Sequence, residues 1–175
     1  MLKKSTAAAA SAAAALVFLA AAFAGLPLVP AVTVRETRSE RLAAVFPARR
    51  GDGVTIVYRH SVNKGESSDY LRILPDGAFL LERSVFESFG AGMSDGFEPG
   101  VTMRMTDEGV ELTGLRRRFD VVNLAVGTVA NHRLTVGGNT AALAAVVAPG
   151  TLVRIAYERV APLDAIRRKI GAVPQ

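Results

Sequence analysis

From residue 54 to residue 157, apolar and polar side chains alternate in short runs, the pattern of β-strands with one buried face. The clearest run is Val54–Val62, and the others are expected at residues 69–74, 78–89, 101–106, 110–113, 121–126, 132–136 and 152–157. Turn sequences such as Pro75-Asp76-Gly77 separate them. We therefore expect an all-β, mainly antiparallel domain over residues 51–160, a β-sandwich or an open barrel of about seven or eight strands.

The segments around these strands carry other patterns. Residues 25–50 are expected to be a linker, a lead-in or a covering segment, because residues 33–41 are mostly polar and charged. The alanine-rich residues 140–148 suggest a short helix. A terminal helix is expected over residues 162–170, within a tail of residues 161–175. Acidic Asp164 lies in its first turn and basic Arg167 in its last, which suits the helix dipole.

The first 24 residues look like a targeting segment. Lys3 and Lys4 precede an uncharged stretch around Leu16–Leu19, and Ala22-Phe23-Ala24 offers a small-residue cleavage site. Two alternatives follow: a cleaved signal peptide, or a weak anchor that attaches the protein to the inner membrane. Arginines just beyond the segment argue against export by the positive-inside rule, but the leader and cleavage site outweigh them. We expect a periplasmic or otherwise extracytoplasmic protein.

Composition excludes several classes of site and partner. The 175 residues contain no cysteine and two histidines, so disulfides, thiolate chemistry and multi-histidine metal cages are excluded. No nucleotide-binding, zinc-protease or hydrolase motif is present. The net charge of +5 includes two leader lysines, and the run Arg116–Arg118 lacks a second basic run or aromatic ladder nearby. We therefore predict no catalytic residue set, metal, cofactor or nucleic-acid partner.

Candidate binding residues gather between residues 60 and 92. His60 and Asp69 each share the apolar parity of their strand, so we expect them on one face within hydrogen-bond reach. They would form either a site for a ligand, a proton or a metal ion, or a buried pair that only satisfies the histidine. Ser61 must face the opposite way and is a poor nucleophile candidate. His132 is expected to fill or border the core.

The next strand leads into a glycine-rich loop. Residues 78–89 are expected to form this strand, with or without a bulge. One face of the strand should carry Phe79, Leu81, Val85 and Phe89, and Glu87 shares that face. Glu87 then lies just before Gly90 and Gly92, where a backbone without Cβ atoms lets a ligand approach closely. The alternatives are a strand-end charge in solvent and ordinary turn glycines. The candidate ligand-binding residues are His60, Asp69, Glu87, Gly90 and Gly92.

Several of these residues belong to strings that together resemble a known family. The strings are Tyr58-Arg59-His60-Ser61-Val62, Asp69-Tyr70 and Phe86-Glu87-Ser88-Phe89-Gly90-Ala91-Gly92-Met93, with weaker matches at residues 132–134 and 149–153. They resemble the bacterial domain-of-unknown-function family 1850 over roughly residues 50 to 160. The family usually has paired acidic residues where this chain has Ser68 and Asp69, so a role that needs two carboxylates there does not carry over.

The resemblance implies a small extracytoplasmic protein encoded beside tripartite ATP-independent periplasmic (TRAP) transporters, usually of the TAXI type. Two hypotheses follow. The first is a non-enzymatic accessory module that binds a transporter component or a small solute. The alternative is a periplasmic enzyme that uses His60 with Asp69 or Glu87 as acid and base. The absence of catalytic motifs favours the first.

Overall fold

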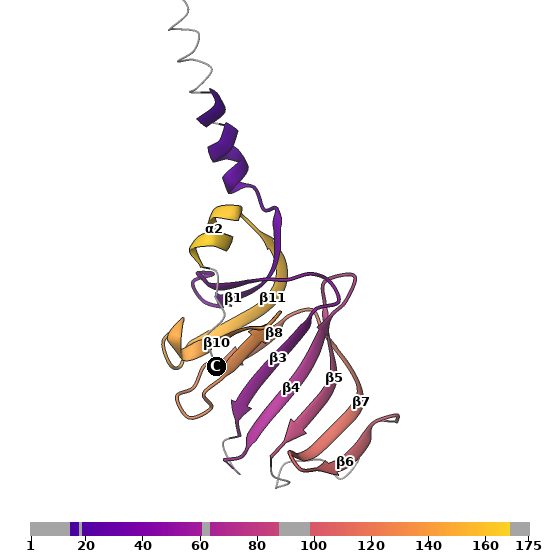
Figure 1. Ribbon diagram of the computed structural model, residues 1–175. Helices are drawn as coiled ribbons and strands as arrows, with labels where there is room; N and C mark the ends of the chain where they lie inside the picture. The colour runs from indigo at the N-terminus through magenta and orange to yellow at the C-terminus, as the bar shows by residue number, and fades with distance from the viewer. Residues whose placement is uncertain (1–14, 18, 61–63, 88–98, 169–175) are drawn as a thin grey trace, which may run out of the picture.

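The computed structural model describes residues 15–17, 19–60, 64–87 and 99–168, and their strands form two antiparallel sheets (Figure 1). The larger sheet has the order β10-β9-β3-β4-β5-β7-β6. In chain order its strands are β3 (Gly53–Arg59), β4 (Glu66–Ile73), β5 (Phe79–Phe86), β6 (Thr102–Thr106), β7 (Gly109–Phe119), β9 (Arg133–Val136) and β10 (Asn139–Ala142). The smaller sheet, in the order β2-β1-β11-β8, holds β1 (Val29–Glu36), β2 (Leu42–Pro47), β8 (Val122–Ala125) and β11 (Leu152–Val160).

The two sheets enclose one apolar core, as the alternating pattern predicts. Val32, Phe46 and Ile155 come from the smaller sheet and are fully buried. Phe79 and Leu134 enter the same core from the larger sheet. The all-β antiparallel sandwich is therefore confirmed, although the described residues form eleven strands.

Two of the additional strands, β1 and β2, lie in residues 25–50, where a linker or lead-in segment was expected. β1 pairs with both β2 and β11 along its length. Val32 faces the main core, while Ala31 and Val45 pack on the other side of the sheet against Ala165. Because both faces of this sheet are buried here, the sequence lacks the alternation that marks a half-buried strand.

Ala165 belongs to the terminal helix α2 (Pro162–Arg167), which confirms the short C-terminal helix. The helix expected over residues 140–148 is wrong. Residues 139–142 form β10 instead, followed by a single 3₁₀ turn at Leu143–Ala145. Gly137 and Gly138 both have positive φ, 56° and 81°, as a two-residue hairpin turn requires, and this turn returns the chain onto β9.

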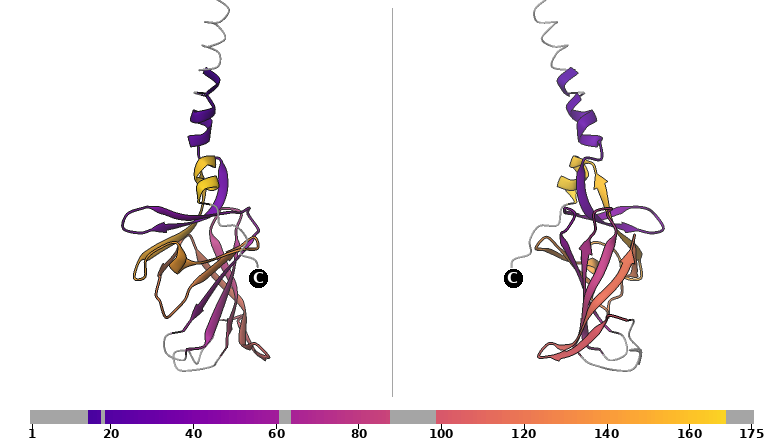
Figure 2. Two further views of the ribbon diagram at one scale, coloured as in Figure 1. Left: turned by 60° about the vertical axis from the view of Figure 1, so that its left-hand side comes forward. Right: turned by 90° about the vertical axis from the view of Figure 1, so that its right-hand side faces the viewer.

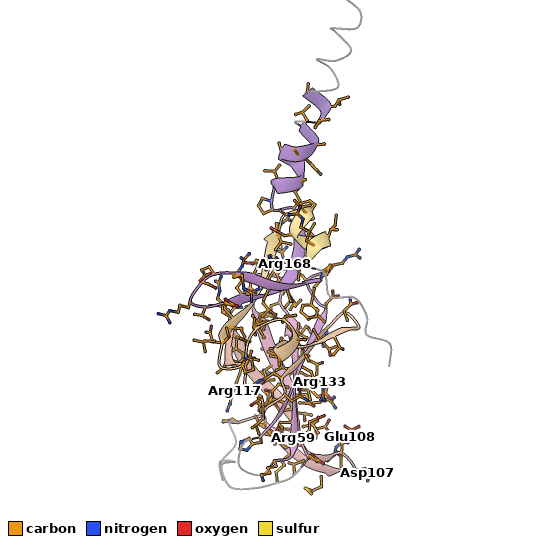
Figure 3. All side chains as sticks on the ribbon, turned by 90° about the vertical axis from the view of Figure 1, so that its left-hand side faces the viewer. Arg59, Asp107, Glu108, Arg117, Arg133 and Arg168 are labelled. Atoms are coloured by element: carbon orange, nitrogen blue, oxygen red, sulfur yellow. The ribbon has the colours of Figure 1, made fainter. Side chains whose placement is uncertain are left out.

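The larger sheet extends past the smaller one at the end opposite α2 and the N-terminal helical residues (Figures 1 and 2). We call this end, formed by the end of β3, the start of β4, the end of β5 and the β6–β7 turn, the loop end. Figure 3 shows Arg59, Asp107 and Glu108 there and Arg168 at the opposite end. Of the helices within the described residues, none has both the length and the apolarity needed to cross a bilayer.

Candidate functional site

A group of polar side chains interrupts the apolar inner face of the larger sheet toward the loop end. Directly paired residues form rows across the sheet, and one row reads Leu134, Ile56, Asp69, Ser84 and Leu112. The next row toward the loop end contains Tyr58, Ser67, Phe86 and Val110. We call Tyr58, Ser67, Asp69, Ser84 and His132 the inner-face cluster.

The members of this cluster contact one another. Ser84 Oγ donates a 2.6 Å hydrogen bond to Asp69 Oδ1. Ser84 and Ser67 are both buried. The side chains of Tyr58 and Ser67 share a second hydrogen bond. The ring of Tyr58 stacks on His132 with 5.9 Å between the ring centroids. These contacts join residues from β3, β4, β5 and the segment before β9 into one polar site.

The protonation equilibria of the cluster reflect its burial. Removal from water raises the pKa of Asp69, and the hydrogen bond from Ser84 only partly opposes this. Burial also raises the pKa of the Tyr58 phenol, with a further contribution from the nearby Asp69 charge. Burial lowers the pKa of His132, whose Nδ1 is buried without a hydrogen-bond partner. The cluster therefore favours a neutral imidazole and resists a carboxylate charge.

The expected contact between His60 and Asp69 is wrong. Asp69 lies opposite Ile56, whereas the backbone N–H of His60 bonds to the carbonyl oxygen of Gly65. Four residues, or about 13 Å of strand, separate His60 from the position opposite Asp69. The error arises because β4 begins at Glu66, which makes the connection shorter and shifts the register.

The expected orientation of β5 is also wrong beyond Leu81. The pairing of β5 with both neighbours shifts between Leu81 and Arg83, which marks a β-bulge at Glu82. The bulge turns Ser84 to the inner face and Val85 to the outer face. It therefore places Ser84 beside Asp69, and places Glu87 on the opposite face of the sheet from Asp69.

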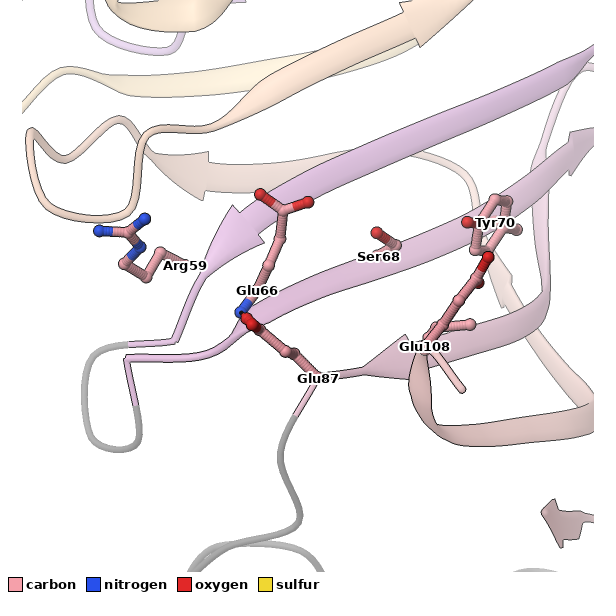
Figure 4. A pocket seen from close by; sticks show the side chains of 7 residues that line it. Arg59, Glu66, Ser68, Tyr70, Glu87 and Glu108 are labelled. Carbon is pink, nitrogen blue, oxygen red and sulfur yellow. Dashed lines mark hydrogen bonds between the residues drawn. The ribbon is translucent and has the colours of Figure 1, made fainter. Parts of the chain in front are cut away.

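On this outer face, Glu87 lines an open groove with a volume of about 510 Å³ (Figure 4). Val85 and Tyr70 belong to its lining, together with Arg59, Glu66, Ser68 and Glu108. Glu87 Oε2 accepts a 2.7 Å hydrogen bond from the backbone N–H of Glu66, and the Glu66 side chain pairs with Arg133 at 2.8 Å. Three carboxylates and one arginine give the groove an acidic lining.

A charged network lies beside the groove. Glu111, with a side chain only 8% exposed, binds Arg83 at 2.8 Å and Arg104 at 2.6 Å. The hydrogen bond from Arg83, followed by that from Arg104, holds the pKa of Glu111 below its usual value. The Arg83 guanidinium lies 3.8 Å from the centre of the Tyr70 ring, a cation–π contact. The network fixes Tyr70, and with it one wall of the groove.

The predicted site residues thus divide between two faces. Asp69 is in the inner-face cluster, Glu87 is in the outer groove, and His60 follows the end of β3. Gly90, Gly92 and Ser61 lie outside the described residues. Within the described ranges, no group of three or more histidine, aspartate and glutamate side chains could hold a metal ion.

Sequence reasoning missed Tyr58, Ser67 and Ser84 as site residues. The alternation of the strands did indicate two of them. Ser67 has the same parity as Asp69 on β4, and Tyr58 lies directly opposite Ser67 on β3. The alternation did not indicate Ser84, because the bulge in β5 changes its face. His132 was expected at the border of the core, and it is half-buried against Tyr58.

Comparison with known proteins matched the chain to a family model. The family model described as a domain of unknown function (DUF1850) matches residues 54–143, about half of the chain. The matched region runs from β3 to β10, so it includes every strand of the larger sheet and both candidate surfaces. No curated protein and no solved structure matched the chain.

Proposed function

The chain belongs to the DUF1850 family, and we propose that it is an exported accessory module of a TRAP-type solute transporter. It acts by contact, binding a transporter component or a small solute through the loop end of the larger sheet. The transporter partner follows from the resemblance of the sequence motifs to this family. The leader with Lys3, Lys4 and Ala22-Phe23-Ala24 supports an extracytoplasmic location.

The observation that carries this proposal is the acidic outer groove beside Glu87. The groove is formed on rigid strands, since Glu66, Ser68, Tyr70 and Val85 belong to β4 and β5. A rigid, partly apolar surface with a few fixed polar groups suits recognition of a partner. Its acidic lining suits a partner surface or solute that carries positive charge.

Binding is favoured over acid–base catalysis by the same geometry. A general acid–base pair needs its members within hydrogen-bond reach of one reacting group. His60 and Asp69 are separated by about four residues along the strand, and Glu87 faces away from Asp69. The enzyme alternative therefore loses the His60–Asp69 pair, and the pairing of His60 with Glu87 is what remains of it.

The experiment is solute uptake in cells that lack this gene and keep the neighbouring transporter. Uptake should fall in the deletion strain and return with the wild-type gene. The variant Glu87→Ala should fail to restore it, with a loss of roughly tenfold if Glu87 contributes about 1.4 kcal/mol to the contact. The matched control is Glu82→Ala in β5, because the Glu82 side chain is 40% exposed, pairs with Arg72 and does not line the groove.

Uptake that is unchanged by the deletion would overturn the proposal, as would equal rescue by Glu87→Ala and wild type. Purified protein should also capture a transporter component, and Glu87→Ala should weaken that capture more than Glu82→Ala. Circular dichroism of both variants checks that each keeps its β-sheet content.

A further inference from the structure

The terminal helix α2 turns its large apolar side chains away from the core. Ala165 faces the smaller sheet and is buried against Ala31 and Val45. Leu163 and Ile166 lie three residues apart, on one side of the helix, and are 41% and 76% exposed. A helix that only covered the sheet would bury the leucine and the isoleucine and expose the alanine. The reversed arrangement indicates that the outer side of α2 contacts an apolar partner.

The segment that leads into β1 extends this apolar surface. Val29, the first residue of β1, pairs with Val160, two residues before α2 begins, so the residues that precede β1 lie beside the helix. The N-terminal helical residues leave the domain at this same end (Figures 1 and 2). Leu26 and Leu28 are exposed here and follow Ala24, so a cleaved leader would leave both in place. We call four exposed side chains the apolar patch: Leu26, Leu28, Leu163 and Ile166.

Basic side chains accompany the apolar patch. Arg167 and Arg168 are exposed at the end of α2. Arg159 is exposed as well, and its Nη1 donates a 3.4 Å hydrogen bond to the carbonyl oxygen of Leu28. No ion pair within the described residues includes any of these three arginines. The helix itself contains one acidic residue, Asp164, so positive charge predominates around the patch.

We propose that the apolar patch and its three arginines rest on the surface of a bilayer that contains anionic lipids. Apolar side chains enter the boundary between headgroups and acyl chains, while guanidinium groups contact the lipid phosphates. A retained leader would hold this same end of the domain at the membrane. A second copy of the chain fits less well, because it would present the same positive charge.

This contact would also orient the domain. The loop end lies at the opposite end from α2 (Figures 1 and 2), so the groove beside Glu87 would point away from the membrane. A partner or solute could then reach the groove from the aqueous side. The inference goes beyond the proposed function, because it adds a lipid surface as a partner of the folded domain.

The test uses a tryptophan as a local reporter, since the chain contains none. Ile166→Trp places it in the apolar patch. Met105→Trp is the matched control at the loop end, because Met105 is 71% exposed. Each full-length variant is titrated with vesicles of phosphatidylcholine and phosphatidylglycerol in equal amounts, with bromine-labelled acyl chains as the quencher. The fluorescence of Ile166→Trp should shift to the blue and be quenched, because interfacial side chains lie about 5–10 Å into the boundary. That of Met105→Trp should not change.

A second pair of variants tests the charge in the Ile166→Trp background. Arg168→Gln should weaken the contact about fivefold, which corresponds to about 1 kcal/mol for one arginine near an anionic surface. Arg59→Gln is the control and should leave the contact unchanged, because Arg59 lies at the loop end, opposite Arg168 (Figure 3). Vesicles of phosphatidylcholine alone should quench Ile166→Trp less than the anionic vesicles do.

Three results would overturn the proposal. The first is quenching of Ile166→Trp that is no stronger than that of Met105→Trp, even if the leader binds the protein to the vesicles. The second is equal quenching by neutral and anionic vesicles. The third is fluorescence of Ile166→Trp that is already shifted to the blue without vesicles, which would show that protein covers the patch.

The membrane contact and the transporter function fail separately. If Ile166→Trp stays in water but uptake still depends on Glu87, the membrane contact is wrong and the transporter function stands. If anionic vesicles quench Ile166→Trp but deletion of the gene leaves uptake unchanged, the membrane contact stands and the transporter function is wrong.

Discussion

Two neighbouring rows on the inner face of the larger sheet differ sharply in what they contain. One row consists of Val136, Val54, Leu71 and Leu81, all buried and apolar. The adjacent row toward the loop end begins and ends with Leu134 and Leu112 but has Asp69 and Ser84 near its middle. The same strands thus carry the core and, about two residues further along, a polar site.

The difference separates two effects. Strand alternation decides on which face of the sheet a side chain lies, whereas the burial of that face decides whether a charged side chain is stable there. The first row contributes to stability through burial, at about 25 cal/mol per Å² of apolar surface removed from water. The second includes a carboxylate whose pKa is raised by desolvation, so it opposes stability at neutral pH. At neutral pH the two rows therefore contribute to stability with opposite signs.

Truncating the apolar side of this comparison should have the largest effect. Leu134 is fully buried in the core, so Leu134→Ala should lower the free energy of unfolding by about 2–5 kcal/mol through lost transfer energy and a cavity. Urea denaturation measures the change. Leu152→Ala, at a side chain that is 49% exposed, should cost less than about 1 kcal/mol. Equal losses for both variants would contradict the assignment of the core.

The loop end depends on a close backbone approach between β5 and β7, and a second variant tests it. Gly109 has φ of 119°, and a Cβ there would lie 2.1 Å from the Phe86 carbonyl oxygen. Gly109→Ala should therefore destabilise the protein by about 1–3 kcal/mol through strain and the displacement of β5. Gly100→Ala is the control: φ is 92° but the space around a Cβ is empty, so only strain remains. If Gly109→Ala costs no more than the control, the pairing at the loop end is wrong.

The same two rows show how far the sequence could predict this structure. Period-two alternation identified β3, β4 and β9 and the parity of Asp69, because each of these strands has one buried face. It could not reveal the bulge at Glu82, since the residues on either side of it still alternate. Nor could it show that β1 is buried on both sides, because this depends on β2, β11 and α2 packing around it.

For the candidate site, the sequence identified the region of the chain that contains it but not the contacts between its residues. Asp69 and Glu87 were both selected, but the bulge puts them on opposite faces, and register separates His60 from Asp69. Alternation alone leaves this register open, because a shift of two or four residues keeps every side chain on the same face of the sheet. The hydrogen-bond partner of Asp69, Ser84, follows from the pairing of β4 with β5 beyond the bulge.

Removing the charge from the row that contains Asp69 should have a smaller effect, and it sharpens the comparison of the two rows. A raised carboxyl pKa means that the folded state holds this proton more tightly than the unfolded chain. The contribution of Asp69 to the free energy of unfolding is therefore greatest at low pH. It declines as the pH rises from the ordinary carboxyl pKa to the raised one. Asp69→Asn should match wild type near pH 3 and exceed it at pH 7, by less than about 1 kcal/mol. Urea denaturation at both pH values measures this, and a variant less stable than wild type at pH 7 would show that the carboxylate is structurally required.

The smallest effect should come from His132 and should have the opposite dependence on pH. Burial lowers its pKa, so the folded state releases this proton more readily than the unfolded chain. Its contribution is complete above the ordinary histidine pKa and is lost as the pH falls toward the lowered value. Because the ring is only half-buried, the change should be a few tenths of a kcal/mol, roughly the scale of a surface substitution.

His132→Phe tests this, because phenylalanine keeps a ring against Tyr58 but cannot bind a proton. The difference in unfolding free energy between wild type and His132→Phe should change as the pH is lowered from 7 to 5, with wild type losing stability. In wild type, the Cε1 proton resonance of His132 should titrate below the ordinary histidine value. Titration above that value would mean that the imidazolium is stabilised in the fold, for example by Asp69. The inner-face cluster would then contain its own counter-ion for Asp69.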